Sequence, residues 1–391
     1  MDYSKILSSK VQDIKPSAIR KFFDMLEGIE GVVALTVGQP DFVTPWHIRD
    51  AAIESLQQGK TYYTSNKGMP ALCSEISKYE KKRIGVEYDP KSEILVTVGG
   101  SEAIDVAIRA LVDPGDEVIV TEPCFVCYSP MVHLAGGVAI SAHTRVENKF
   151  KLTPELLRSK ITDKTKLLII SYPNNPTGAI MTREDLEAIA EVLRGTDIMV
   201  ISDEIYGELT YGKEHVSIAS LEGMRERTIV VNGFSKAFAM TGWRLGYLMA
   251  PHELASQMLK IHQYAIMCAP TMSQFAAVEA LANGEGDVEM MRDEYNRRRR
   301  LIVDGLNKIG LECFEPEGAF YVYPYIGGFG LSSEEFCDRL LRESKVAIVP
   351  GTAFSDEGEG FARISYAYSV KHITEALERI EDFVNKLKRE R

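Results

Sequence analysis

The chain has 391 residues, of which 45% are hydrophobic and 26% charged, and a formal net charge of -11. This is the composition of a globular protein with a large core, and the acidic balance argues against nucleic acid as a partner, because nucleic-acid-binding surfaces are basic. We expect the one basic run, "RRRR" at 297–300, to form the solvated face of a helix. The sequence contains no apolar run long enough to span a membrane.

The amino-terminal residues and the cysteines indicate the cellular compartment in which the protein works. The first residues, "MDYSKILSSKVQDIKPS", lack the apolar core of a signal peptide. The six cysteines are scattered, and the C-x-x-C pair of Cys124 and Cys127 has no second pair to complete a metal site. We therefore expect a reducing, cytoplasmic location and interpret this pair as two small loop residues, with a redox or metal role as the alternative.

Short β-rich runs alternate with helical patterns through the middle of the chain. Segment 101–112 places its apolar residues on one helical face, and segment 182–194 begins with Thr182 as N-cap and Asp185 three residues later. Near-continuous apolar strands separated by helices predict an α/β fold whose mostly parallel sheet is buried on both faces. The predicted strands are 93–98, 117–121, 166–171, 197–202, 227–231 and 244–250.

The pattern changes from about residue 290, where a long helix is followed by "GAFYVYPYI", a helix, short strands and a final helix. This order favours a second, α+β domain. We divide the chain into an amino-terminal segment (1–45) that joins the small domain, a large domain (46–288) with three α/β/α layers, and a small carboxyl-terminal α+β domain (289–391).

The segments that follow the predicted strands carry glycines, acids, asparagines and aromatic residues. Ligands of open α/β sheets bind outside the carboxyl ends of the strands, so these side chains should converge on one crevice. The segments are "GGSEA" (99–103), "EPCFVCY" (122–128), "YPNNPTG" (172–178), "DEIY" (203–206) and "NGFSK" (232–236).

The first of these segments joins a strand end, two glycines and a helix N-terminus. Free backbone N–H groups and the helix dipole favour anion binding there, and a plain turn is the alternative. Gly99-x-Ser101-x-Ala103 also resembles the nucleophile elbow of α/β-hydrolases, with His372 as an available base. That alternative lacks an oxyanion segment of the H-G-G-G type and leaves Lys236 unexplained.

Lys236 lies among phenylalanine, alanine, methionine and tryptophan in "NGFSKAFAMTGWRLGY" (232–247). Burial lowers the pKa of a lysine amine and makes it a nucleophile suited to Schiff-base formation, whereas a surface lysine with a covered stem is the alternative. An anion site, this amine, a stacking ring at Phe125 and a carboxylate at Asp203 for a pyridinium nitrogen together indicate a pocket for pyridoxal phosphate.

Several segments, in this order, resemble those of one enzyme family. The chain is similar to the class I/II pyridoxal-phosphate-dependent aminotransferases of fold type I, the aspartate and aromatic aminotransferase group. The resemblance extends from about residue 30 to 380. The matching segments are "GQPDF" (38–42), "YPNNPTG", "SDEIY", "SKAFAMTGWRLGY" and "ARISYA".

The resemblance implies roles for residues around the cofactor ring. Lys236 forms the Schiff base with pyridoxal phosphate and then moves a proton between the substrate Cα and the cofactor C4′. Asp203 keeps the pyridine nitrogen protonated. Asn175 and Tyr206 hydrogen-bond the 3-oxygen, and Phe125 stacks on the ring.

The resemblance also implies contacts to the phosphate and to the substrate. Arg363 binds the substrate α-carboxylate, Gly38 leaves room for it, and Phe125 and Asn175 also line the substrate. Tyr63 reaches the phosphate of the neighbouring subunit in a homodimer with shared active sites. The other expected phosphate contacts are backbone or hydroxyl donors of Gly100, Ser101 and Glu102, the hydroxyl of Ser235 and the guanidinium of Arg244.

Two positions depart from the family pattern. Phe125 is tryptophan in many aspartate-selective members, which leaves aromatic or broad specificity open. Gly233 stands where many members have a hydroxyl residue, so one phosphate contact is missing or is made by Ser235.

The predicted activity is transfer of an amino group from an L-amino acid, aspartate or aromatic, to a 2-oxo acid such as 2-oxoglutarate. Its partners are then small molecules, with no nucleic acid, membrane or metal. A cysteine-S-conjugate β-lyase is the alternative, because it uses nearly the same residues. A non-catalytic module is a more distant one, since Lys236 and Arg363 are both present.

Overall fold

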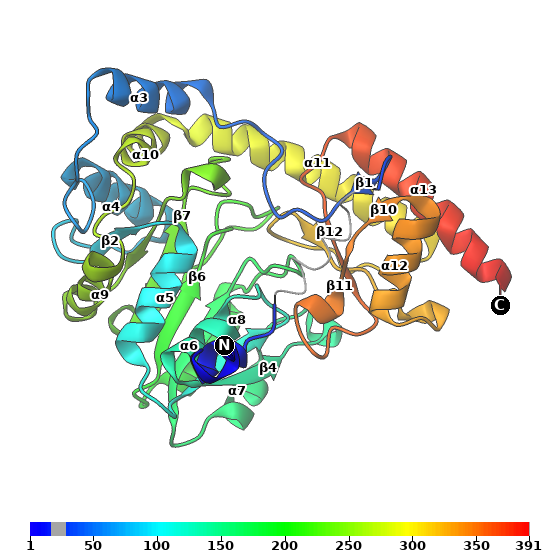
Figure 1. Cartoon of the computed structure of the whole chain (residues 1–391), viewed down its shortest axis with the longest axis horizontal. Coiled ribbons are helices and arrows are strands. Elements are labelled where there is room, and N and C mark those ends of the chain that lie inside the picture. The colour runs from blue at the N-terminus through cyan, green and yellow to red at the C-terminus, as the bar shows by residue number, and fades with distance from the viewer. Residues whose placement is uncertain (17–28, 391) are drawn as a thin grey trace.

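The computed structural model of the chain describes residues 1–16 and 29–390. In this part of the chain a large domain is built on a seven-stranded sheet of order β2-β8-β7-β6-β5-β3-β4. The long helix α11 (Glu285–Ile309) runs from this domain to a smaller one beside it (Figure 1). The strands of the large sheet are β2 (Ile94–Thr97), β3 (Glu117–Glu122), β4 (Val138–His143), β5 (Thr165–Ser171), β6 (Met199–Asp203), β7 (Thr228–Gly233) and β8 (Gly246–Met249).

The sheet is mostly parallel, as the sequence predicts. Strands β7, β6, β5, β3 and β4 pair in parallel, whereas β8 runs antiparallel to both of its neighbours, β7 and β2. An apolar run does not encode strand direction, so the reversal of β8 lies outside what the pattern predicts. The edge strand β4 is not among the predicted strands, because its side chains are mostly half-buried or exposed.

Helices cover both faces of the sheet and produce the three predicted layers (Figure 1). On β7, Ile229 and Val231 pack into one cluster with α5 and α9, while Val230 between them packs into another with α4 and α10. This alternation shows why three consecutive residues at the centre of β7 are all apolar. The helices of the large domain are α3 (Trp46–Gln57), α4 (Pro70–Ile84), α5 (Gly100–Leu111), α6 (Tyr128–Ala135), α7 (Pro154–Lys160), α8 (Arg183–Leu193), α9 (His252–Ala265) and α10 (Thr271–Asn283).

Helix α8 begins at the capping signal found in the sequence. The hydroxyl of Thr182 accepts a hydrogen bond from the Asp185 N–H at 3.3 Å, and the Asp185 carboxylate accepts one from the Thr182 N–H at 2.8 Å. This reciprocal capping box satisfies two backbone donors that the helix itself leaves free.

The small domain combines helices with short strands, as expected. Its antiparallel strands have the order β11-β12-β9, and β10 pairs in parallel with β1 of the amino-terminal segment. Its elements are β1 (Val33–Ala34), β9 (Tyr321–Val322), α12 (Ser333–Ser344), β10 (Val346–Ala347), β11 (Val349–Pro350), β12 (Ala362–Ser365) and α13 (Val370–Glu390).

The amino-terminal segment contacts both domains. Its β1 joins the small domain, but the short helix α1 (Ser9–Gln12) lies on the large one, where Lys10 Nζ donates a hydrogen bond to the Leu134 carbonyl at 3.3 Å. The domain boundaries 1–45, 46–288 and 289–391 stay a proposal. The last of them falls inside the continuous helix α11 rather than in a loop.

The expectation that residues 297–300 form a solvated face is wrong for half of the run. Arg298 and Arg299 are only 6% and 9% exposed. Arg298 forms an ion pair with Asp41 at 2.7 Å, and Arg299 forms one with Glu315 at 2.7 Å. A run of four residues spans a full helical turn, so two of its members must face the protein.

None of the helices in the described residues combines the length and apolar character needed to cross a membrane.

Candidate active site

A cavity of about 360 Å³ lies at the carboxyl ends of the strands, between the large domain, residues 36–39 and the small domain. A volume of this order is typical of small-molecule sites. The structure thus brings the strand-following segments together as the topology argument predicts. The predicted site residues that line the cavity are Gly38, Gly100, Ser101, Phe125, Asn175, Asp203, Tyr206, Ser235, Lys236, Arg244 and Arg363.

Lys236 follows β7 and points its amine into this cavity. Its Nζ donates a hydrogen bond of 2.5 Å to the Gly38 carbonyl and lies 5.7 Å from the centre of the Tyr206 ring. Burial lowers the pKa of Lys236 to about 8, with the charges of Arg363 and Arg244 acting in the same direction. About a tenth of the amine is therefore neutral at pH 7, far more than for an ordinary lysine, and the neutral form is the one that a nucleophile or general base requires.

Asp203 ends β6 and supplies the buried carboxylate. Tyr128 Oη donates a hydrogen bond to its Oδ2 at 2.7 Å, and the Ile205 N–H donates to its Oδ1 at 3.2 Å. Burial raises the pKa of Asp203, while these two hydrogen bonds and the charge of Lys236 lower it. A buried carboxylate in this position favours a cation placed against it in the cavity.

The turn from β2 into α5 forms an anion-binding corner. The N-terminus of α5 has no side-chain cap, so its first N–H groups face the cavity region unpaired by the helix. Gly99 has φ +79°, and a Cβ there would lie 2.7 Å from Arg244 Nη2. Glycine thus allows the guanidinium of Arg244 to approach the helix N-terminus, which adds a full positive charge to the dipole.

Arg363, on β12, is almost completely buried. Its Nη1 donates to Asn175 Oδ1 at 3.0 Å and its Nη2 to the Thr36 carbonyl at 2.5 Å, while its Nε has no hydrogen-bond partner among the described residues. The guanidinium lies 4.7 Å from the ring centres of both Tyr321 and Phe354. A planar cation held in this way is suited to bind a carboxylate.

Gly38 and Tyr206 both lie next to the hydroxyl of Tyr321. Tyr206 Oη and Tyr321 Oη lie 2.6 Å apart, and a Cβ on Gly38 would come within 2.3 Å of the same Tyr321 oxygen. Any larger residue at position 38 would therefore displace Tyr321. The cavity depends on glycine here because of this close approach.

Two predicted site residues do not line the cavity. The side chain of Glu102 turns away, with Oε1 2.6 Å from His262 Nδ1 and Oε2 accepting a hydrogen bond from the Val98 N–H, so only its backbone is left for the predicted role. Tyr63 is 77% exposed and lies outside the cavity of its own chain.

The structure does not support the α/β-hydrolase alternative, in which Ser101 is the nucleophile, or a redox or metal role for the cysteine pair. His372 Nε2 lies 3.0 Å from the Ala34 carbonyl, in the small domain, and does not line the cavity that holds Ser101. Cys124 and Cys127 are free thiols, and burial raises the pKa of both. Within the described residues no three histidine, cysteine or acidic side chains are grouped as a metal site.

Several cavity residues are not singled out by the sequence patterns. Tyr128 lies in the predicted crevice segment 122–128, and its place after a strand end is a signal that could identify it. Thr36 and Tyr321 come from segments outside the strand series, so only the packing of the small domain brings them to the site. Thr241 lies in a 3-10 turn after Lys236 and contributes a hydroxyl.

Comparison with known proteins assigns this site to a family. The model of the aminotransferase class I and II family matches residues 30–380. The chain is 54% identical to "Putative aminotransferase YugH" of Bacillus subtilis, over 97% of this chain and 98% of that protein. It is 45% identical to "Aromatic-amino-acid aminotransferase 2" of Thermococcus litoralis, over 98% and 99% of the two chains. The solved structure of the aspartate aminotransferase from Thermus thermophilus with maleate superposes with a TM-score of 0.91 at 42% identity, covering 96% and 99%.

The chain therefore belongs to the class I and II aminotransferases of fold type I. It is an amino acid aminotransferase, and its cofactor is pyridoxal phosphate. The cavity fits this group: the amine of Lys236, the anion-binding corner at Gly99 and the buried carboxylate of Asp203 match an aldehyde, a phosphate and a ring nitrogen.

Proposed function

We propose that Lys236, Asp203 and Tyr206 are the catalytic residues of this aminotransferase and that Arg363 anchors its amino acid substrate. One observation carries the assignment: the Lys236 amine and the Asp203 carboxylate line the same cavity as the Arg363 guanidinium. This places a nucleophile, a partner for a ring cation and a carboxylate anchor within one small volume.

When bound, pyridoxal phosphate supplies an aldehyde that accepts the amino group and a ring that withdraws electrons from the substrate Cα. Asp203 would keep the ring nitrogen protonated, and Tyr128 orients Asp203 through its hydrogen bond. Asn175 and Tyr206 would hydrogen-bond the 3-oxygen, and Phe125 would stack on the ring.

The phosphate end and the substrate end are bound by different elements. Arg244 and the N-terminus of α5 would hold the phosphate, together with the hydroxyls of Ser101 and Ser235 and the N–H groups of Gly100 and Glu102. At the other end Arg363 binds the α-carboxylate, and Gly38 leaves room for it beside Tyr321.

Lys236 performs the proton transfer. With pyridoxal phosphate bound, its amine would take the proton from the substrate Cα and deliver it to the cofactor C4′. The lowered pKa, about 8, places the amine near the pH at which a base of this kind works best. The neighbouring Gly38 carbonyl accepts a hydrogen bond from this amine and can orient it.

The proposed donors are aspartate and aromatic L-amino acids, with 2-oxoglutarate as acceptor. Support comes from the names of the two relatives described above, one an aromatic and one an aspartate aminotransferase. A phenylalanine at position 125, lining the cavity, is compatible with both classes.

We further propose a homodimer with shared active sites. Tyr63 and its neighbour Tyr62 are exposed, as are Tyr264 and Met267. Asn66 joins the two exposed segments by donating a hydrogen bond to the Met267 carbonyl at 2.8 Å. An exposed aromatic patch of this kind favours contact with a second chain, and Tyr63 would then reach the partner's phosphate site.

The free cysteines support a cytoplasmic location.

Visible absorption of the purified enzyme tests the function. Addition of one amino acid without any oxo acid should convert the yellow pyridoxal form into the pyridoxamine form, and 2-oxoglutarate should restore it. Aspartate, glutamate, an aromatic amino acid and cystathionine are compared in turn. Pyruvate release from cystathionine, with the pyridoxal form unchanged, would instead establish the β-lyase activity.

A further inference from the structure

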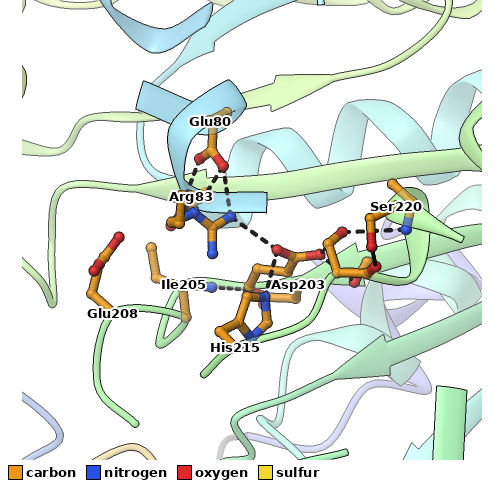
Figure 2. A network of polar contacts seen from close by, with 12 residues as sticks. Glu80, Arg83, Asp203, Ile205, Glu208, His215 and Ser220 are labelled. Atoms are coloured by element: carbon orange, nitrogen blue, oxygen red, sulfur yellow. Dashed lines mark hydrogen bonds and ion pairs between the residues drawn. The ribbon is translucent and has the colours of Figure 1, made fainter. Parts of the chain in front are cut away.

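A network of buried charges lies behind Asp203, on the side away from the cofactor cavity. Glu204 is 1% exposed and Glu80, on α4, is fully buried. Arg83, one turn from Glu80, lies between them. Its Nε donates to Glu80 Oε2 at 2.8 Å (Figure 2). Its Nη2 donates to Glu204 Oε2 at 2.9 Å. His215 Nε2 lies 2.7 Å from the same Glu204 oxygen. None of these four side chains lines the cofactor cavity.

Glu204 is held in its ionised form by these neighbours. Burial raises the pKa of Glu204, but the charges of His215 and Arg83, with hydrogen bonds from His215 and Ser217, lower it to about 2. Its second oxygen accepts hydrogen bonds from Ser217 Oγ at 2.5 Å and Ser202 Oγ at 3.0 Å. Four side chains thus bind this one carboxylate and fix its position.

Glu204 directly follows Asp203, the last residue of β6, and its N–H continues the pairing with β7 by donating to the Val231 carbonyl at 2.8 Å. Successive side chains of an extended chain point to opposite faces, so Asp203 lines the cavity while Glu204 joins the network. The charge of Glu204 acts across the backbone and raises the pKa of Asp203. It therefore adds negative potential at the place where Asp203 meets the ring nitrogen.

We propose that Glu204 is a positioning residue for the cofactor: its buried carboxylate, fixed by Arg83 and His215, increases the preference of the Asp203 site for a protonated ring nitrogen. The inference rests on the proposed role of Asp203. It goes beyond that role, because Glu204 touches neither cofactor nor substrate and acts through the electrostatic potential.

The expected size of the effect follows from Coulomb's law. A unit charge at about 10 Å, with an effective dielectric constant of about 20, changes the equilibrium for a buried cation by about tenfold. The other charged and titratable groups near Asp203 are Tyr128, Cys127, Tyr206 and Lys236. Those near Glu204 on its own side are Arg83, Glu80, His215 and Tyr88. All are unchanged in the variants below except the one replaced.

The test compares two ligands that differ at one atom. Pyridoxamine 5′-phosphate carries the ring nitrogen, and its 1-deaza analogue carries a C–H group there; both bind without a covalent bond to Lys236. The ratio of their dissociation constants, measured by calorimetry with the dimeric apoenzyme, reports the preference for the protonated nitrogen. A purely structural role of Glu204 would weaken both ligands alike and leave this ratio unchanged.

We expect Glu204→Gln to reduce the preference for pyridoxamine phosphate about tenfold, and Glu204→Asp, which keeps the charge, to restore most of it. The matched control is Glu80→Gln, which removes an equally buried carboxylate farther from Asp203, on the other side of Arg83, and should change the ratio less than Glu204→Gln does. Equal ratios in Glu204→Gln and Glu80→Gln, or no change in either, would overturn the proposal.

Two further variants distinguish a failure of this inference about Glu204 from a failure of the proposed role of Asp203. If Glu204→Gln does not fold, His215→Gln carries the test: it leaves the Glu204 charge less compensated, so the preference should rise, and an unchanged or lower preference counts against Glu204. Asp203→Asn should abolish the preference by itself. If it does not, the assignment of Asp203 fails, whereas a response of Asp203→Asn without one of Glu204→Gln refutes only the present inference.

Discussion

Arg363 Nη1 donates a hydrogen bond of 3.0 Å to Asn175 Oδ1, and this bond connects the small domain to the loop that follows β5. The proposed substrate anchor and a proposed cofactor contact are therefore held by each other. A change at either residue should affect the position of both, because both side chains are buried and have few alternative partners.

Replacement of Arg363 by lysine should raise the KM for amino acid substrates by about 30- to 150-fold, since a charge-assisted bidentate contact contributes about 2 to 3 kcal/mol. The affinity for pyridoxal phosphate should change far less. Steady-state kinetics and cofactor titration of the same variant check this. A loss of cofactor affinity as large as the rise in KM would contradict the assignment of Arg363 to the substrate.

Replacement of Lys236 by alanine should lower turnover by at least about 10⁴-fold, because the residue supplies both the covalent link and the proton transfer. The variant should still bind pyridoxal phosphate, through Arg244 and the N-terminus of α5, but should not show the yellow lysine-linked absorption band. Reduction of the C=N bond with borohydride, followed by denaturation and gel filtration, distinguishes covalently attached from released cofactor. Cofactor that stays covalently attached in this variant would show that another amine is the nucleophile.

The stability of the cofactor-free protein should depend on pH through Lys236. The pKa of its amine is lowered from 10.5 to about 8 in the fold, so the unfolded chain binds more protons between these two values. The free energy of unfolding should therefore rise as pH increases from about 8 to about 10.5, by about 3 kcal/mol in total from this group.

Urea unfolding of the apoenzyme at a series of pH values measures this effect. Lys236→Met provides the control, because methionine has a similar length and does not titrate. The difference in unfolding free energy between the two proteins should be constant below about pH 8 and should change only above it. A constant difference up to about pH 10.5 would mean that the amine keeps its ordinary pKa.

Replacement of Tyr128 by phenylalanine should weaken binding of pyridoxamine phosphate about tenfold. The hydroxyl donates the hydrogen bond of 2.7 Å to Asp203, and its loss removes the bond that orients this carboxylate. Calorimetric titration checks the prediction. Phe125→Leu serves for comparison, since it removes ring stacking without touching Asp203; an unchanged affinity in Tyr128→Phe would assign Tyr128 to the core alone.

The proposed sharing of active sites predicts complementation between two inactive variants. Tyr63→Ala and Lys236→Ala should each be impaired as homodimers, but a hybrid dimer contains one site with neither change. Mixing the two proteins under conditions that allow subunit exchange should therefore restore activity. If mixing leaves the activity at the level of the separate variants, then Tyr63 acts within its own chain or not at all.

The local sequence pattern is sufficient to predict the framework of this protein. The buried strands contain short apolar runs such as residues 229–231 of β7, and helix α8 begins at the Thr182–Asp185 capping box, because these signals depend only on residues close together in the chain. Parallel strands present their carboxyl ends at one edge of a sheet, and this rule predicts that Asp203 and Lys236 lie in a single crevice. Both side chains line the same cavity.

What the local pattern does not contain is decided by tertiary packing. The reversed direction of β8, the burial of Arg298 and Arg299, the approach of Tyr321 to Gly38 and the outward turn of Glu102 each depend on a partner distant in the sequence. The same is true of the Arg83–Glu204 pair, whose members are 121 residues apart. Sequence periodicity reports how a residue meets its neighbours along the chain, whereas the charges, donors and clearances that shape this active site exist only after the chain has folded.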